Sequence, residues 1–132
     1  MPRLDPERVA ELKKKLSSEQ YDICFRSATE APFSGELTYE TGAGTYHCVV
    51  CETPLFTSEA KFISKTGWPS FDAPIAGALE EHKDRSYGMV RTEIRCGTCG
   101  AHLGHVFDDG PTTTGKRFCI NSLALEFRKS EP

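Results

Sequence analysis

The sequence predicts a mainly antiparallel β fold with short helices at its N-terminal end. Residues 5–23 contain two helix-start signals, whereas from about Thr29 onward glycine and proline separate short alternating segments that are typical of strands. Two Cys-x-x-Cys pairs lie far apart in the chain, and a metal ion bound by both would join distant strands. A length of 132 residues suits one domain, which we expect to consist of a helical region at 1–27 and a β core at 28–132.

The composition is that of a globular protein and argues against several classes of partner. Lys and Arg number 16 and Asp and Glu 19, and the net charge of −3 predicts no binding to nucleic acid or to anionic membranes. No apolar run approaches the ~20 residues that span a bilayer. The first seven residues lack the apolar core of a secretion signal, so we expect a cytoplasmic protein. No feature indicates an obligate dimer, and we expect a monomer.

Both predicted helices are identified by the residues at their starts. Asp5 is suited to cap a first helix and Pro6 to occupy its first position, and apolar residues follow at helical spacing. Ser17 and Gln20 have the spacing of a capping box, which predicts a second short helix directly after the first.

The predicted strands alternate between polar and apolar residues. The expected strands are 46–51, 87–95, 103–107 and 117–127, with a turn at 108–111 between the last two. Residues 65–71, which include Trp68, are expected to form a loop that carries large aromatic side chains.

The two cysteine pairs predict a structural zinc site. Cys48 and Cys51 form one pair and Cys96 and Cys99 the other, and four thiolates around one zinc ion make a closed tetrahedral site that cannot activate water. Gly100 is suited to the tight turn after the second pair. A redox-active pair and free buried cysteines are the alternative interpretations.

A second ligand set is also conceivable, since two histidines follow the second pair at steps of three residues. Cys96, Cys99, His102 and His105 would form that set. It would leave Cys48 and Cys51 without a role, which makes it the weaker assignment.

Cys119 is a candidate nucleophile. Alternation along residues 117–121 places Arg117, Cys119 and Asn121 on one polar face, with Phe118 and Ile120 on the other. A neighbouring cation favours the nucleophilic thiolate, and His102 and His105 are positioned in sequence to serve as proton donor and orienting group. The alternative is that Cys119 is a small buried apolar residue.

Several segments together resemble the B-type methionine sulfoxide reductases, which reduce the R epimer of methionine sulfoxide. The segments are Thr29-Glu30-Ala31-Pro32-Phe33-Ser34-Gly35, Gly67-Trp68-Pro69-Ser70-Phe71, Arg91-Thr92-Glu93, His102-Leu103-Gly104-His105 with the residues through Pro111, and Arg117-Phe118-Cys119-Ile120-Asn121-Ser122. The resemblance extends from about Leu16 to Phe127.

This resemblance implies a fold and a set of roles. It implies two antiparallel sheets, a zinc ion bound by the two cysteine pairs, and Cys119 as the nucleophile toward free or protein-bound methionine-R-sulfoxide. It also implies that Trp68 covers the S-methyl group of the substrate and that a histidine protonates the sulfoxide oxygen. The remaining residues that it places in the site are His102, His105, Asp109, Arg117 and Asn121.

One position departs from the pattern of the family. Many members carry a resolving cysteine just before the Gly-Trp-Pro-Ser-Phe segment, where this chain has Thr66. Attack by Cys119 leaves a sulfenic acid that must be reduced again. We expect Cys24, after movement of the N-terminal region, to resolve it as a disulfide that thioredoxin then reduces. The alternative is direct reduction by an external thiol such as thioredoxin or glutathione.

Two other functions are compatible with parts of the sequence. A zinc-stapled binding module would leave Cys119 inert, but it would not need the polar face around that residue. A zinc hydrolase or deaminase would need an open metal position, which four cysteine ligands do not provide.

Overall fold

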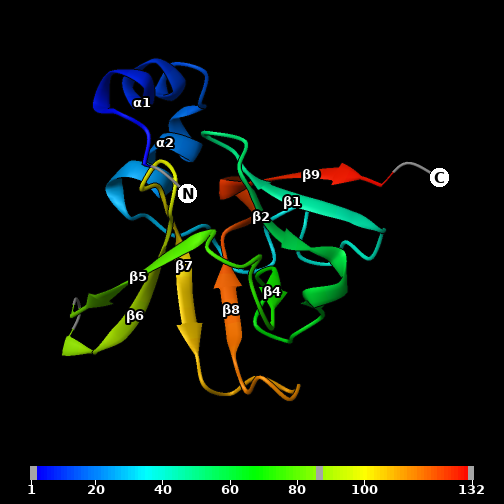
Figure 1. The fold of residues 1–132 in the computed structure, drawn as a ribbon. Helices are drawn as coiled ribbons and strands as arrows, with labels where there is room; N and C mark the ends of the chain where they lie inside the picture. The colour runs from blue at the N-terminus through cyan, green and yellow to red at the C-terminus, as the bar shows by residue number, and fades with distance from the viewer. Residues whose placement is uncertain (1–2, 86–87, 131–132) are drawn as a thin grey trace.

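The computed structural model describes residues 3–85 and 88–130, which form two N-terminal helices and two antiparallel sheets (Figure 1). The three-stranded sheet has the order β2-β1-β9 and the six-stranded sheet the order β3-β4-β8-β7-β6-β5. In chain order, the elements are α1 Pro6–Lys13, α2 Ser18–Arg26, β1 Gly44–Cys48, β2 Pro54–Thr57, η1 Ser58–Ala60, β3 Lys61–Phe62, β4 Ser70–Phe71, β5 Leu79–Asp84, β6 Arg91–Cys96, β7 His102–Phe107, β8 Arg117–Ile120, η3 Ser122–Ala124 and β9 Leu125–Lys129. The predicted fold class is therefore confirmed.

Both helices begin where the sequence predicts. The side chain of Asp5 accepts a hydrogen bond from the backbone of Arg8, and Ser17 and Gln20 form the capping box through bonds of 2.9 and 3.1 Å. Helix α1 buries none of its residues, whereas α2 buries Ile23 and Cys24 against the sheets. Capping therefore sets both starts, and packing fixes α2.

Three of the expected strands differ from the observed ones. The first ends at Cys48, because the residues that follow form a turn. The second begins at Arg91, and its expected start at Tyr87 lies outside the described residues. The last is interrupted at Asn121: the part before it belongs to the six-stranded sheet as β8, and the part after it to the three-stranded sheet as β9. Alternation alone does not reveal that the chain changes sheets at this point.

The register of the six-stranded sheet aligns the polar residues of its central strands. Glu93 on β6 pairs with His105 on β7, His105 with Cys119 on β8, and Cys119 with Ser70 on β4. Directly paired residues share a face of a sheet. One face therefore carries a polar row that leads to the cysteine.

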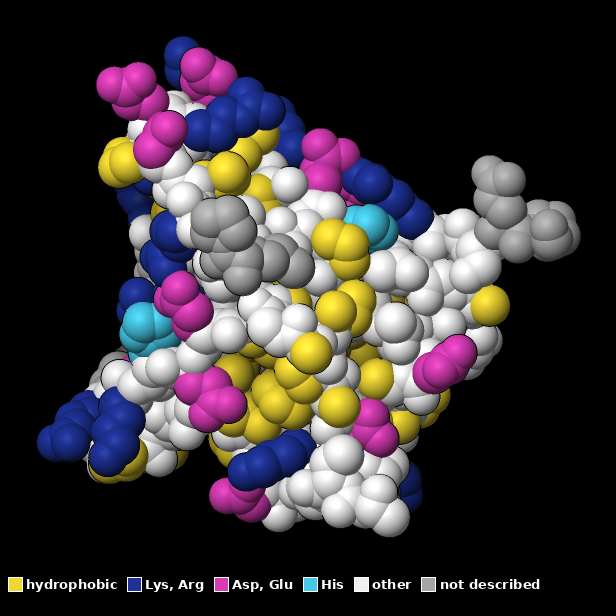
Figure 2. All heavy atoms as spheres, in the orientation of Figure 1, with side chains coloured by type: hydrophobic (Ala, Val, Ile, Leu, Met, Phe, Trp, Pro, Cys, Tyr) yellow, Lys and Arg dark blue, Asp and Glu magenta, His cyan; other side chains and the backbone are white. Residues whose placement is uncertain are grey.

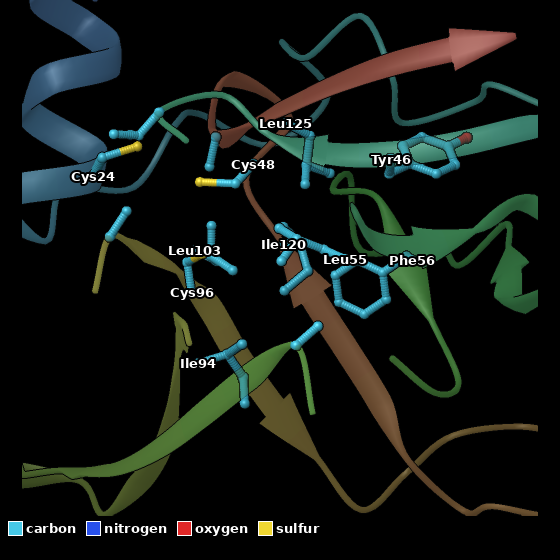
Figure 3. Packing of buried hydrophobic residues seen from close by; sticks show 14 of the residues in the cluster. Cys24, Tyr46, Cys48, Leu55, Phe56, Ile94, Cys96, Leu103, Ile120 and Leu125 are labelled. Atoms are coloured by element: carbon cyan, nitrogen blue, oxygen red, sulfur yellow. The ribbon is translucent and has the colours of Figure 1, made fainter. Parts of the chain in front are cut away.

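The opposite face packs into the core. Ile94 and Ile120, the residues next to Glu93 and Cys119, are fully buried. Figure 3 shows Leu55 and Phe56 from β2 close to Ile120, and the Phe56 ring stacks on that of Phe71 with centroids 4.1 Å apart. The core thus lies between the two sheets, and its aromatic contacts join one sheet to the other.

The surface carries charges of both signs. In Figure 2, basic and acidic side chains lie near one another around the rim of the face, and hydrophobic side chains occupy its middle. No helix among residues 3–85 and 88–130 has the length and apolar character to cross a membrane.

Gly104 allows β7 to approach β8 closely, and its replacement tests the register. A Cβ atom at this position would overlap with the backbone carbonyl of Cys119. We expect Gly104→Ala to lower the free energy of unfolding by about 1–3 kcal/mol, because strands β7 and β8 must separate to relieve the overlap. Urea denaturation measures this change. Gly42→Ala is the control, since its Cβ would meet only the flexible Glu40 side chain within 3.4 Å, and an equal loss there would contradict the interpretation.

Candidate active site and metal-binding cluster

The two cysteine pairs form matching turns. The backbone N–H of Glu52 donates to the carbonyl of Cys48 at 2.9 Å, and that of Gly100 donates to Cys96 at 2.8 Å. Both donors have left-handed backbone angles, φ 66° for Glu52 and φ 78° for Gly100. The expected turn at Gly100 is therefore observed, and the first pair forms the same turn around a glutamate, a residue that adopts this conformation less readily.

These turns bring all four thiols together. Sγ of Cys48 lies 3.7 Å from that of Cys99, Sγ of Cys51 lies 3.6 Å from that of Cys96, and all four sulfur atoms are within 4.8 Å of one another. A tetrahedron with metal–sulfur bonds of about 2.3 Å has edges of about 3.8 Å. The four cysteines are thus able to hold one metal ion.

The alternative ligand set of Cys96, Cys99, His102 and His105 does not form. The side chains of the two histidines are hydrogen-bonded elsewhere, His102 to Glu93 at 2.6 Å and His105 to Asp84 at 2.8 Å. The four-cysteine interpretation is the one that the geometry supports.

A small pocket opens beside Cys119 on the polar face of the six-stranded sheet. Its volume is ≈ 210 Å³, which suits a single side chain better than the larger cofactors and drug-sized ligands that fill about 300–1,000 Å³. The residues that line it are Thr29, Thr66, Trp68, Arg91, Gly104, His105, Phe107, Arg117, Cys119 and Asn121. The pocket therefore joins Cys119 to four of the predicted site residues: Trp68, His105, Arg117 and Asn121.

The protonation of Cys119 depends on two opposing influences. Burial raises the pKa of the thiol, whereas the charge of Arg117 and hydrogen bonds from Thr66 and Arg117 lower it, and the net shift is upward. The expected thiolate-favouring effect of the cation is present, but burial outweighs it. At neutral pH, Cys119 in the free protein is therefore mainly a thiol.

Asp109 holds Arg117 from outside the pocket. The guanidinium donates to both carboxylate oxygens, at 2.8 and 3.1 Å, and stacks over the ring of Phe107 at 4.5 Å. The side chain of Asp109 is 64% exposed and does not line the pocket. Its contact with the site thus runs through Arg117.

The loop that carries Trp68 is anchored to the segment before β1. The indole N–H donates to the carbonyl of Glu30 at 3.0 Å, and the carbonyl of Gly67 accepts from Phe33 at 2.7 Å. Gly67 has a φ of 93°, which favours glycine. These bonds fix the position of the indole beside the pocket.

Asn121 lies where β8 ends, and it bonds to two other segments. Its side chain accepts from the backbone of Glu30 at 3.0 Å and donates to the carbonyl of Leu103 at 3.0 Å. The carboxylate of Glu30 in turn accepts from the backbone of Leu123 at 2.9 Å. This network supports the turn that carries the chain from one sheet to the other.

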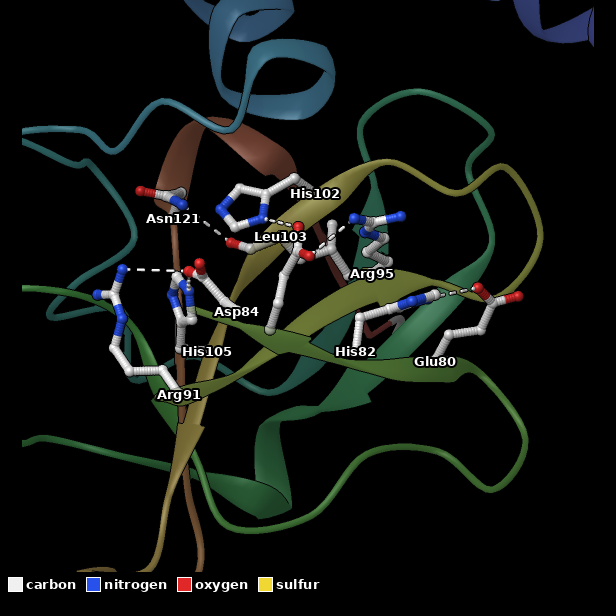
Figure 4. A network of polar contacts seen from close by, with 10 residues as sticks. Glu80, His82, Asp84, Arg91, Arg95, His102, Leu103, His105 and Asn121 are labelled. Carbon is white, nitrogen blue, oxygen red and sulfur yellow. Dashed lines mark hydrogen bonds and ion pairs between the residues drawn. The ribbon is translucent and has the colours of Figure 1, made fainter. Parts of the chain in front are cut away.

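The two histidines lie in different surroundings (Figure 4). His105 lines the pocket, and its Nε2 bonds to Asp84, which also pairs with Arg91 at 3.1 Å. His102 is 4% exposed and lies against the neighbouring groove, outside the residues that line the Cys119 pocket. Burial lowers the pKa of His102 despite its bond to Glu93.

Cys24 lies in the hydrophobic core, away from the residues that line the pocket. Its side chain is 2% exposed. Figure 3 shows it pointing from α2 toward the part of the core that contains Cys48 and Cys96. Burial and the nearby Cys96 raise the pKa of this thiol to about 12. Cys24 is therefore buried away from the solvent and is not one of the residues that line the pocket at Cys119.

Comparison with known proteins identifies the family. A model of the SelR domain matches residues 16–129. The chain belongs to the SelR domain family. It is 51% identical to a protein of Pseudomonas putida (strain W619) over 97% of this chain and 96% of that one. It is also 57% identical to a protein of Burkholderia vietnamiensis (strain G4 / LMG 22486) over 89% and 84%. Both relatives carry the name peptide methionine sulfoxide reductase MsrB.

Three charged residues of this SelR domain were not predicted as parts of its site. Asp84 and Glu93 bond to the histidines, and Arg91 lines the pocket. Arg91 and Glu93 stand two residues apart in a predicted strand, so alternation indicates a shared polar face. Asp84 has no such signal, because the pairing of β5 with β6, rather than local spacing, brings it beside Arg91 and His105.

The charge of Arg117 should be measurable through the reactivity of Cys119. We expect Arg117→Gln to raise the pKa of the Cys119 thiol, because the variant loses the cation that favours the thiolate. The rate of alkylation by iodoacetamide, measured against pH, should then reach its midpoint at higher pH. Lys116→Gln is the control for charge, since Lys116 pairs with Asp108 at the exposed turn. A midpoint that stays at the wild-type pH in Arg117→Gln would refute this assignment.

Proposed function

We propose that this protein reduces methionine-R-sulfoxide, free or within peptides and oxidised proteins, to methionine, with Cys119 as the nucleophile. The observation that carries the proposal is the Cys119 thiol in a pocket the size of one side chain, lined by Trp68, His105 and Arg117. This chain covers most of the length of the two relatives described above, and both bear the corresponding name.

The first step transfers oxygen from one sulfur to another. The sulfur of Cys119 attacks the sulfoxide sulfur as a thiolate, while a histidine, His105 or His102, donates a proton to the sulfoxide oxygen. This attack forms a bond between the two sulfur atoms. The protonated oxygen then moves to the Cys119 sulfur as the S–S bond and the S–O bond of the substrate break, so that methionine leaves and Cys119 becomes a sulfenic acid. Because His105 lines the pocket and His102 does not, we assign the proton donor to His105 and an orienting role to His102.

Trp68 and the polar residues around it have complementary roles. The indole forms an apolar wall for the S-methyl group, and the orientation of that group decides which epimer presents its sulfur to Cys119. Arg117, held by Asp109, stabilises the thiolate when it forms. Asn121 fixes the end of β8, and with it the position of Cys119.

The metal in the four-cysteine cluster is proposed to be zinc. Four thiolates in tetrahedral arrangement are typical of structural zinc sites, and such a site has no open position for water or substrate. The metal therefore has a structural role in this proposal and takes no part in the reaction.

For the second half of the cycle, we propose that Cys24 resolves the sulfenic acid. The thiol of Cys24 attacks the Cys119 sulfur, water leaves, and a disulfide forms that the dithiol of thioredoxin reduces. Cys24 is five residues from Thr29, which lines the pocket, and α2 ends between them at the left-handed Ser27. A disulfide requires the Cα atoms of the two cysteines to come within ~7 Å of each other. In this proposal, the last turn of α2 unwinds to bring Cys24 to Cys119.

The metal assignment predicts stoichiometric zinc. We expect one zinc per chain by mass spectrometry of the native protein, and we expect Cys51→Ser to lose it. The variant should unfold at lower temperature, because structural zinc contributes free energy comparable to the total stability of a domain, about 5–15 kcal/mol. Cys119→Ser, which leaves the cluster intact, should keep both the zinc and the melting temperature. Another metal in the native protein, or zinc retained in Cys51→Ser, would contradict the assignment.

The reductase activity is tested by counting thiols without an external reductant. We expect the R epimer, but not the S epimer, to oxidise reduced protein and to release one methionine per chain. Mass spectrometry of the product should reveal a Cys24–Cys119 disulfide. Cys119→Ser should keep its zinc and release no methionine. If neither epimer changes the thiol count of the wild-type protein, it is not this reductase, and the binding-module interpretation gains support.

The same experiment on Cys24→Ala separates the two halves of the cycle. We expect this variant to release one methionine per chain, to stop at the sulfenic acid and to lose turnover with thioredoxin. Turnover with thioredoxin at the wild-type rate would refute the role of Cys24 and favour direct attack by an external thiol.

A further inference from the structure

Two groups on the polar face of the six-stranded sheet share one arrangement, in which a carboxylate bridges an arginine and a histidine (Figure 4). In the first, Asp84 joins Arg91 to His105. In the second, Glu93 joins Arg95 at 2.9 Å to His102 at 2.6 Å. The proposed function assigns no role to Asp84, although its contact leads directly into the pocket.

The contact of Asp84 determines how the imidazole of His105 is oriented. One oxygen, Oδ2, lies 2.8 Å from Nε2 of His105 and 3.1 Å from a guanidinium nitrogen of Arg91. A carboxylate can only accept, so Nε2 carries the proton of this bond. Among the described residues, Nδ1 of His105 has no hydrogen-bond partner, and His105 lines the pocket. Nδ1 is therefore the ring nitrogen available to a bound ligand.

Carboxylates that bond to functional histidines in this way fix the tautomer and the orientation of the ring. Asp84 is itself fixed, because β5 and β6 pair it directly with Arg91. The side chain of His105 is 12% exposed, so solvent competes little for the bond.

We propose that Asp84 is a positioning residue for the reaction: it holds Nε2 of His105 so that Nδ1 faces the pocket and delivers a proton to the sulfoxide oxygen. This inference rests on the proposed function of the pocket. It adds a residue that touches neither substrate nor Cys119 and acts only through His105.

The second group does not have the same role. His102 bonds to its carboxylate through Nδ1, and its Nε2 is buried with no hydrogen-bond partner among residues 3–85 and 88–130. It also lies outside the residues that line the pocket. The two histidines therefore present opposite nitrogens, and only the one held by Asp84 faces the reacting atoms.

Several charged groups line the two hollows beside His105. They are Arg26 at the end of α2, Lys83, Asp84 and Arg85 at the end of β5, Arg91, Glu93 and Arg95 on β6, His102 on its own strand with ring centroids 5.5 Å apart, and Arg117 and Cys119 on β8. Among these, Asp84 and Glu93 are the carboxylates, and Asp84 is the one that bonds to His105.

Two variants separate the charge of Asp84 from its hydrogen bond. Asp84→Asn keeps a side-chain oxygen that can accept from Nε2 of His105 but removes the negative charge. In single-turnover oxidation by methionine-R-sulfoxide, we expect its maximal rate to fall less than that of Asp84→Leu, because the hydrogen bond that orients the ring is kept. Asp84→Leu removes the acceptor as well. Its maximal rate should fall about 10–100-fold, while the substrate concentration that gives half of the maximal rate changes less than twofold. Glu81→Gln is the control, since Glu81 is exposed on the same strand and faces away from His105.

The coupling to His105 is tested without relying on activity. ¹⁵N spectra of the neutral imidazole, assigned with His105→Gln, should show its proton on Nε2 in the wild type and the loss of this preference in Asp84→Leu, which leaves Nδ1 free to take up from water the proton that it delivers. The rate loss of Asp84→Leu should vanish in the His105→Gln background. An unchanged tautomer, or losses that add, would overturn the proposal. A changed tautomer in a protein that methionine sulfoxide does not oxidise would instead refute the proposed function and leave the positioning contact in place.

Discussion

The four-cysteine cluster joins the two sheets at one point, and the position of the pocket follows from that junction. Cys48 ends β1 of the three-stranded sheet, whereas Cys96 ends β6 of the six-stranded sheet. The matching turns around both pairs fix the directions in which the chain leaves the cluster. One of them leads within three residues from Cys99 to the start of β7, the strand that carries His102 and His105. The cluster therefore fixes the start of the strand that carries both histidines of the proposed site.

From that start, hydrogen-bonded register extends the alignment across the sheet. Glu93, His105 and Cys119 lie opposite one another on three neighbouring strands, so a shift of one residue on any strand would turn its side chain to the core. Gly104 allows the strands to lie close enough for this alignment. The large apolar residues of the other face, stacked between the sheets, oppose such a shift because it would expose them to water.

The pocket combines burial with fixed charges. Burial keeps Cys119 protonated, and Arg117 favours the thiolate. The proposed nucleophile is thereby protected from unwanted oxidation at rest, since the thiolate is the form that oxidants attack. Asp109 and Asp84 hold Arg117 and His105 from outside the pocket, so that the groups nearest the sulfur are fixed by partners that need not touch a substrate.

The sequence by itself determined features that depend on neighbours in the chain. Local spacing predicted the helix starts at Asp5 and Ser17 and the polar face of Arg117 and Cys119. It also predicted the two cysteine pairs of the cluster, with the turn at Gly100. Local spacing did not reveal that the chain changes sheets at Asn121, because the alternation continues through the break. It also did not reveal Asp84, which contacts His105 from a strand two positions away in the sheet. Only the tertiary structure decided these features, because strand pairing brings together residues whose separation along the chain carries no periodic signal.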